Sequence, residues 1–209
     1  MLLETLVVGP LGVNCYILGC EQTGEAVIID PGENPERIKE CLHRLNLKPL
    51  YLLITHGHFD HTGGLKELKK MTDSIICIHR EDVFLLCDGD VHAGFYGFTI
   101  DKPPDADRLL EDGEEIQMGK YIIKVIHTPG HSPGGVSYYI EGSVFVGDIL
   151  FSGSIGRTDL PGGDYNLLLN SVKTRLFTLP PNTIVYTGHG PHTTIDREIK
   201  ENPFFINNY

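Results

Sequence analysis

Residues 50–71 read LYLLITHGHFDHTGGLKELKKM, a stretch with a polar cluster between an expected strand and an expected helix. The apolar run Leu50–Ile54 predicts a strand that is covered on both faces of its sheet. Apolar residues then recur at helical spacing and predict a helix, at Leu65, Leu68 and Met71. The cluster Thr55–His61 therefore occupies a strand-to-helix turn, where α/β proteins tend to carry functional residues.

Four side chains in this turn are candidate metal ligands: His56, His58, Asp60 and His61. In extended backbone His56 and His58 point to the same side, so both can bind one ion. Asp60 and His61 are adjacent, project in another direction and suit a second ion nearby. Imidazole and carboxylate groups favour zinc, iron or manganese over calcium or magnesium. The alternative interpretation is a solvated polar turn with several histidines.

Three further candidate ligands follow expected strands later in the chain, namely His131, Asp148 and His189. His131 lies in the sequence TPGHSPGG, Asp148 closes the run SVFVGD, and His189 lies between two glycines. Glycine beside each polar residue lets backbone segments approach closely. Three more ligands in matching contexts favour a metal centre over a solvated turn.

The first half of the chain predicts strands followed by a helix. Strands are expected in the first thirty residues, including 13–18 and 26–29. The sequence Asn34-Pro35-Glu36 then supplies an N-cap, a proline in the first helical turn and an early acid. We expect a surface helix of about a dozen residues that stops near Asn46.

The second half repeats this order. Strands are expected at 121–126, 136–140, 144–146 and 183–186, with a helix from about 164 to 177 and a short polar helix near the end. Two packed sheets with helices outside suit this order, each half delivering ligands from its strand ends. Residues 88–106 show no clear period and are interpreted as a long loop. Its aromatic residues either line a substrate groove or cap the core: Phe95, Tyr96 and Phe98.

The composition predicts an ordinary soluble protein with one domain over residues 1–209. Hydrophobic residues make up 41% and charged residues 22% of the chain, as in typical globular proteins. A formal net charge of −11 argues against nucleic acid or an anionic membrane as the partner. Since no secretory start and no membrane-length apolar run occur, a cytoplasmic location is expected. No particular oligomeric state is indicated.

The cysteines are odd in number and lack C-x-x-C spacing: Cys15, Cys20, Cys41, Cys77 and Cys87. Most lie in apolar stretches, which favours buried structural thiols over a ligand or redox role. A reducing compartment is therefore expected. The five histidines outside the ligand pattern are interpreted as surface or hydrogen-bonded residues: His43, His79, His92, His127 and His192.

In order and spacing, the candidate ligands resemble the signature of the metallo-β-lactamase superfamily. The resemblance covers the whole chain and implies an α/β fold, an αββα sandwich of two mixed sheets flanked by helices, with the metals at one edge. It implies a first metal held by His56, His58 and His131. It implies a second metal held by Asp60, His61 and His189, with Asp148 bridging the two. Asp30 matches the superfamily's first motif position and would support the histidine loop as a hydrogen-bond acceptor.

Within the superfamily, two further segments resemble the glyoxalase II group, or hydroxyacylglutathione hydrolases: Gly147-Asp-Ile-Leu-Phe151 and Gly156–Asp164. The ending Gly188–Thr193, followed by Glu201-Asn-Pro203, agrees with this resemblance. Longer members carry a C-terminal helical domain with much of the glutathione-binding surface, and this chain is expected to lack it. The resemblance thus implies the short, single-domain form.

Two metal ions a few ångströms apart can share a hydroxide, and that hydroxide attacks an electrophilic carbonyl. Asp60 and Asp148 would bind the metals and orient this hydroxide. No G-x-S-x-G elbow occurs and no cysteine lies in a catalytic context, so water is the expected nucleophile. A thioester suits the site because its thiolate, with a pKa of about 8.5, leaves without a general acid. The leading hypothesis is hydrolysis of a small thioester, S-D-lactoylglutathione above all.

Other functions stay open at this point. Persulfide dioxygenases share much of the motif, and a single Fe²⁺ would then be held by His56, His131 and Asp148. A metal-containing binding module without catalysis is a third hypothesis, and lactone or β-lactam hydrolysis remains possible for the fold. Arg157 would either meet an acidic substrate or pair with Asp159 or Asp164.

Overall fold

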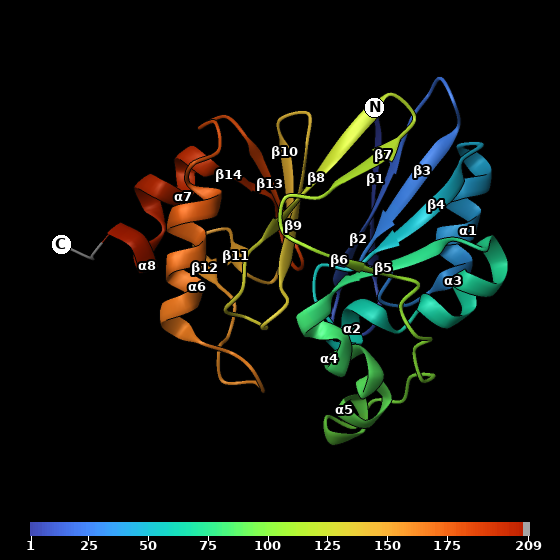
Figure 1. The fold of residues 1–209 in the computed structure, drawn as a ribbon, viewed down its shortest axis with the longest axis horizontal. Coiled ribbons are helices and arrows are strands. Elements are labelled where there is room, and N and C mark those ends of the chain that lie inside the picture. The colour runs from blue at the N-terminus through green and yellow to red at the C-terminus, as the bar shows by residue number, and fades with distance from the viewer. Residues whose placement is uncertain (207–209) are drawn as a thin grey trace.

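The computed structural model describes residues 1–206, and two six-stranded sheets face each other in it (Figure 1). The first sheet contains, in spatial order, β1 (Leu2–Val8), β2 (Val13–Gly19), β3 (Glu25–Ile29), β4 (Lys48–Leu53), β5 (Ile75–His79) and β6 (Arg108–Leu110). The second contains β14 (Thr193–Thr194), β13 (Ile184–Thr187), β10 (Ser143–Gly147), β9 (Val136–Ile140), β8 (Tyr121–His127) and β7 (Glu115–Met118). Parallel and antiparallel pairs occur in both sheets, as in β3–β4 and β1–β2.

Helices cover the outer face of each sheet (Figure 1). On the first sheet these are α1 (Pro35–Arg44) and α3 (Leu65–Thr72). On the second they are α6 (Tyr165–Ser171), the π-helical turn η2 (Val172–Leu176), α7 (Ile195–Glu201) and α8 (Pro203–Ile206). Short elements complete the fold: α2 (Phe59–Thr62), η1 (Arg80–Asp82), α4 (Val83–Cys87), α5 (Gly89–Phe95), and the hairpin of β11 (Leu150–Phe151) and β12 (Ser154–Ile155). The predicted αββα sandwich is confirmed.

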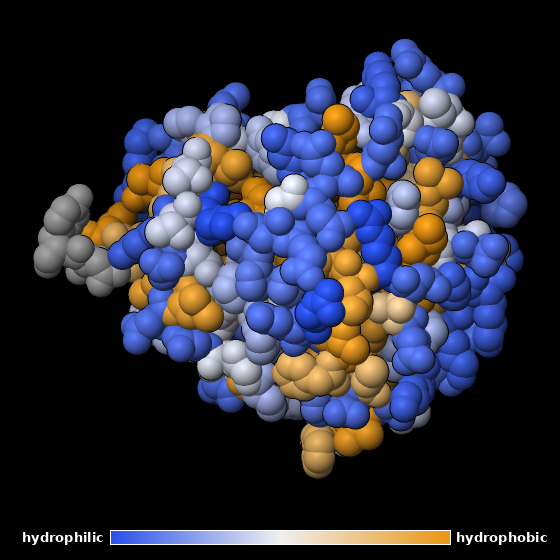
Figure 2. All heavy atoms as spheres, viewed as in Figure 1, coloured by the Kyte–Doolittle hydropathy of each residue, from blue (hydrophilic) through white to orange (hydrophobic). Residues whose placement is uncertain are grey.

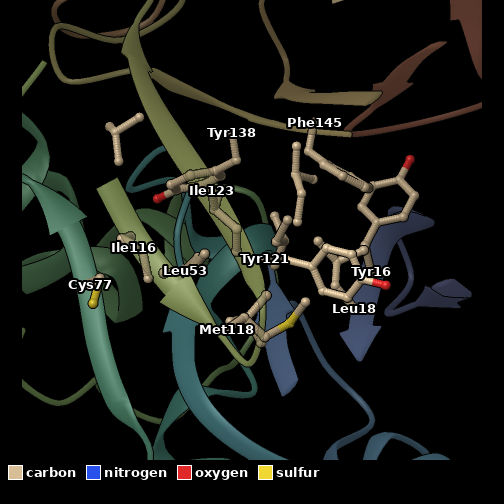
Figure 3. Packing of buried hydrophobic residues seen from close by; sticks show 14 of the residues in the cluster. Tyr16, Leu18, Leu53, Cys77, Ile116, Met118, Tyr121, Ile123, Tyr138 and Phe145 are labelled. Carbon is tan, nitrogen blue, oxygen red and sulfur yellow. The ribbon is translucent and has the colours of Figure 1, made fainter. Parts of the chain in front are cut away.

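Three apolar clusters separate the four layers. The cluster between the sheets includes Leu18, Leu53 and Tyr138 (Figure 3), a second lies under α1 and α3, and a third lies under α6 and α7. Along β3, Val27 and Ile29 enter the first cluster while Ile28 enters the second. Because successive side chains point to opposite faces, a strand buried on both faces must be apolar throughout. This is why β3 and β4 appear as continuous apolar runs in the sequence.

Most expected elements are present, with differences in detail. The helix expected from 164 to 177 is divided into α6 and η2, and Asp164 caps it by accepting a hydrogen bond from Leu167 N at 2.9 Å. Helix α1 ends before Asn46, whose φ of 53° lies in the left-handed region, as expected of a stop residue. Of the cysteines, four are buried, Cys87 is half-buried, and all are unpaired.

Two predictions are wrong. Asn34 adopts a φ of 56° and its side chain makes no cap hydrogen bond to α1; it accepts instead from Gly9 N at 3.0 Å. Residues 88–106 are not all loop, because α5 covers Gly89–Phe95. Its two glycines weaken the local helical signal, and its packing against α2 and α4 stabilises it instead. Within residues 1–206, no helix has the length and apolar character needed to cross a membrane.

Candidate metal centre

Strand ends bring the candidate ligands together. Strands β3 and β4 are parallel neighbours, as are β10 and β13, so the carboxyl ends of each pair lie at one sheet edge. The two sheets meet there, since Asn14 N donates to Gly188 O at 2.8 Å and Val136 N to Thr55 O at 2.8 Å. Gly188 must be glycine for this approach, because a Cβ would collide with Asp148 Oδ1.

The first group of ligand atoms belongs to His56, His58 and His131, all within 4.8 Å of one another. His58 Nδ1 and His131 Nε2 are 2.9 Å apart and face each other. The second group is formed by Asp60, His61 and His189, whose ligand atoms also lie within 4.8 Å of one another. His189 Nε2 is 3.3 Å from Asp60 Oδ2. These are the two sets that the sequence resemblance implied.

Asp148 lies between the two groups. Its Oδ1 is 3.5 Å from His61 Nε2, and its Oδ2 is 3.5 Å from His189 Nε2 and 3.9 Å from His131 Nε2. One carboxylate therefore faces one histidine of the first group and two of the second. This position suits a ligand shared by two cations.

Unpaired buried atoms test whether metal ions fit these residues. Within residues 1–206, five buried side-chain nitrogen or oxygen atoms lack a hydrogen-bond partner, and four of them are His56 Nε2, His58 Nε2, His61 Nε2 and Asp148 Oδ1. Leaving a buried polar atom unpaired costs about 1–3 kcal/mol, so such a concentration in one place favours a bound ligand. A donor set of imidazole and carboxylate groups fits zinc, iron or manganese.

The charge states agree with this fit. Burial and the neighbouring His131 lower the pKa of His58 to about 3, and burial with the neighbouring histidines lowers that of His56 as well. Both imidazoles are therefore neutral at neutral pH and keep a lone pair for a metal. Although burial opposes it, three carboxylates raise the pKa of His61: Asp60, Asp148 and Asp30. That local excess of negative charge favours a bound cation.

Hydrogen bonds behind the ligands fix which ring nitrogen is free. Asp30 Oδ2 accepts from His61 Nδ1 at 3.0 Å and from Thr55 Oγ1 at 2.6 Å. Thr55 Oγ1 lies 3.0 Å from His56 Nδ1, and it accepts from that nitrogen because its own proton goes to Asp30. On the other sheet, His131 Nδ1 donates to Arg157 O at 2.7 Å. In all three histidines Nε2 is left to face the centre.

Asp82 is hydrogen-bonded to two loops that carry candidate ligands, and the sequence patterns did not point to it. Its buried carboxylate accepts from Gly57 N at 2.9 Å, from Ser132 Oγ at 2.7 Å and from Gly134 N. Gly57 lies between His56 and His58, whereas Ser132 follows His131. The carboxylate therefore fixes the position of one loop relative to the other. No local pattern marks this residue, because its partners lie 25 to 52 positions away.

Replacing Asp82 by asparagine is expected to weaken metal binding about 10- to 100-fold, the usual cost of losing a group that orients ligands. An amide places a donor against one of the three groups that now donate to the carboxylate, so one ligand loop must shift. Titration of the metal-free chain with zinc measures the change, with the exposed Asp105→Asn as the matched control. Unchanged zinc affinity in D82N would contradict the role of this residue.

A cavity of about 540 Å³ opens beside the centre. Candidate ligands line it, and so do the aromatic residues of the 88–106 segment, which therefore face a cavity and do not simply cap the core: Phe95, Tyr96 and Phe98. Arg157 also lines it and is paired with Asp159 through hydrogen bonds of 2.7 and 2.8 Å. Asp164, the other expected partner, caps α6 instead.

Two histidines outside the ligand pattern are hydrogen-bonded, as expected. His127 Nε2 donates to Pro133 O at 2.9 Å, and His79 Nδ1 accepts from Glu81 N at 3.3 Å. Their rings stack with centroids 4.2 Å apart. With Glu81 they form a further group whose ligand atoms lie within 4.8 Å of one another.

Comparisons with known proteins agree with this geometry. The family model of the metallo-beta-lactamase superfamily matches residues 8–189. The "probable metallo-hydrolase YqgX" of Bacillus subtilis is 39% identical over 94% of both chains. The "hydroxyacylglutathione hydrolase GloC" of Haemophilus influenzae is 35% identical over 98% of both chains.

Solved structures are also similar. BLEG-1, described as a B3 metallo-beta-lactamase, has a TM-score of 0.92 and 41% identity, over 98% of this chain and 100% of that one. TTHA1623, described in a di-iron-bound form, has a TM-score of 0.89 and 42% identity, over 96% and 99%. ETHE1 from Myxococcus xanthus has a TM-score of 0.84 and 29% identity, over 97% and 84%.

Proposed function

The chain belongs to the metallo-beta-lactamase superfamily, and from that membership we propose that it hydrolyses a small thioester at a centre of two divalent metal ions. Zinc is the metal proposed first, and iron and manganese are the alternatives. The substrate proposed first is an S-2-hydroxyacylglutathione such as S-D-lactoylglutathione. The similarity to GloC, named a hydroxyacylglutathione hydrolase, supports this choice.

The observation that carries the proposal is the position of Asp148 between two complete groups of ligand atoms. A pair of bound divalent ions would lower the pKa of a water molecule and polarise the carbonyl that it attacks. Asp60 and Asp148 place carboxylate oxygens where they can accept a proton and orient that water. Asp30 holds His61 directly and His56 through Thr55, so both rings stay aligned.

The cavity lining supports water as the nucleophile. Among the described residues that line it, none is a serine, threonine, cysteine or lysine. The side chains that most often form acyl intermediates are therefore missing from the described lining. A thioester also needs little help on the leaving-group side, because a thiolate of pKa about 8.5 departs unprotonated. Amide cleavage would require a proton donor for the leaving nitrogen.

A persulfide dioxygenase with one Fe²⁺ on His56, His131 and Asp148 is the alternative. The intact second group, Asp60, His61 and His189, is compatible with both reactions, since persulfide dioxygenases share much of the same motif. The two activities separate in an oxygen electrode. Oxygen uptake with glutathione persulfide, together with no thioester cleavage, would favour the dioxygenase.

The direct test is cleavage of S-D-lactoylglutathione by chain reconstituted separately with zinc, iron and manganese. We expect turnover with at least one metal and none in the metal-free chain, because the residues alone supply no nucleophile. A β-lactam serves as the competing substrate. Lactam hydrolysis without thioester cleavage would overturn the substrate assignment, and no hydrolysis of either would favour a binding module.

A further inference from the structure

An aromatic wall extends from the candidate ligands to the surface, and we define it as Phe59, Phe95, Tyr96 and Phe98. Phe59 lies in α2 between the candidate ligands His58 and Asp60. Its ring is 5.9 Å from that of Tyr96, at 25°, and 5.7 Å from that of Phe98, at 32°. All four residues line the cavity beside the metal centre. A substituent next to the reacting carbonyl therefore meets aromatic rings.

The outer end of the aromatic wall is open to solvent. Phe95 is 81% exposed and Tyr96 is 53% exposed. Figure 2 shows apolar surface gathered at the end of the molecule where α4 and α5 lie. Aromatic side chains left in water lose the free energy that burial would supply, and exposed patches of this kind commonly mark binding sites.

Few charged groups face the same cavity. Outside the candidate ligands, the side chains in its described lining that can carry a charge are His92 and Arg157, and Arg157 already donates two hydrogen bonds to Asp159. The rest of the lining is largely apolar and includes Leu85, Phe151 and Leu160. A strongly polar substituent would lose its hydration there without finding matched partners. An apolar substituent would instead displace water from the rings.

We propose that the aromatic wall selects acyl groups with a bulky apolar substituent, aromatic ones above all, over small acyl groups such as lactoyl. This inference rests on the proposed thioester hydrolysis for its reaction, and on the cavity alone for its binding preference. An added apolar group in a pocket of this kind improves binding or turnover by about tenfold or more.

The test separates binding from turnover. Isothermal titration of the zinc-loaded full chain measures the Kd of D-mandelate and of D-lactate, which differ by phenyl in place of methyl. Hydrolysis of S-mandeloylglutathione and S-D-lactoylglutathione is measured in parallel. We expect mandelate to bind about tenfold more tightly, with a similar advantage in kcat/KM for the mandeloyl thioester.

A double variant, F95A/Y96A, tests which residues cause the preference. Both side chains are exposed, so we expect the variant to fold and to bind zinc as before. The preference should fall to within about twofold. The matched control is Phe84→Ala, an aromatic residue on α4 that is 44% exposed and does not line the cavity. F84A should keep the full preference.

The outcomes distinguish the two proposals. Equal binding of the two acids by the wild-type chain, or an unchanged preference in F95A/Y96A, overturns the inference even when both thioesters are cleaved. Cleavage of neither thioester overturns the proposed reaction. A mandelate preference that F95A/Y96A removes still supports the binding role of the aromatic wall in that case.

Discussion

Replacing Asp148 by alanine is expected to lower thioester hydrolysis by about a thousandfold or more, the scale of losing a residue on which a catalytic unit depends. Its carboxylate faces histidines of both candidate groups, at 3.5 Å from His61 and from His189 and 3.9 Å from His131. Removing it would take one ligand from each bound cation and would leave the buried histidines without one of their negative neighbours. Both groups should then bind metal more weakly.

Turnover of S-D-lactoylglutathione and metal content per chain are measured together for D148A. The control is the exposed Asp105→Ala, which removes a carboxylate far from the candidate ligands in sequence. We expect D105A to keep both the activity and the metal. Full activity in D148A would rule out a centre that depends on this carboxylate, whereas lost activity with full metal content would restrict its role to orienting the water.

Metal binding itself is expected to raise the thermal midpoint Tm of the chain by about 10 °C. In the metal-free chain the free energy of unfolding is reduced by the unpaired buried nitrogens of His56, His58 and His61. An ion that binds only the folded chain satisfies these atoms, and it adds a free energy of unfolding that grows with the logarithm of its free concentration over Kd. Zinc and iron suit imidazole ligands and manganese suits a mixed set of imidazole and carboxylate ligands, whereas magnesium requires oxygen ligands.

Tm is measured after removal of metal with a chelator and again after loading with each ion, with magnesium as the control ion. His189→Ala provides a second control, because it removes one ligand of the second group and leaves the first group intact. We expect its metal content to fall from two ions to about one. A Tm that magnesium raises as much as zinc does would contradict a nitrogen-rich site.

Local patterns in the sequence predict much of the fold. Side chains alternate between two buried faces in β2, β3 and β4, so continuous apolar runs mark these strands without knowledge of their partners. Asp164 and Asn46 similarly act through their immediate neighbours, as a cap and a stop. Segment α5 is different, because its glycines give a weak local signal and its helix depends on packing. Local reasoning therefore predicted a loop there.

For the metal centre, too, some features follow from local sequence and others depend on long-range contacts. By itself the sequence determined which residues are available, since His56, His58, Asp60 and His61 fall in one turn and His131, Asp148 and His189 follow other strands. Only the tertiary structure decided that Asp148 lies between two groups, that Asp82 connects two loops, and that aromatic rings line the cavity. The physical reason is range. Helix caps and strand periodicity depend on residues within a few positions, whereas these contacts join residues far apart in the chain. His61 and Asp148 differ by 87 positions, and Asp60 and His189 differ by 129.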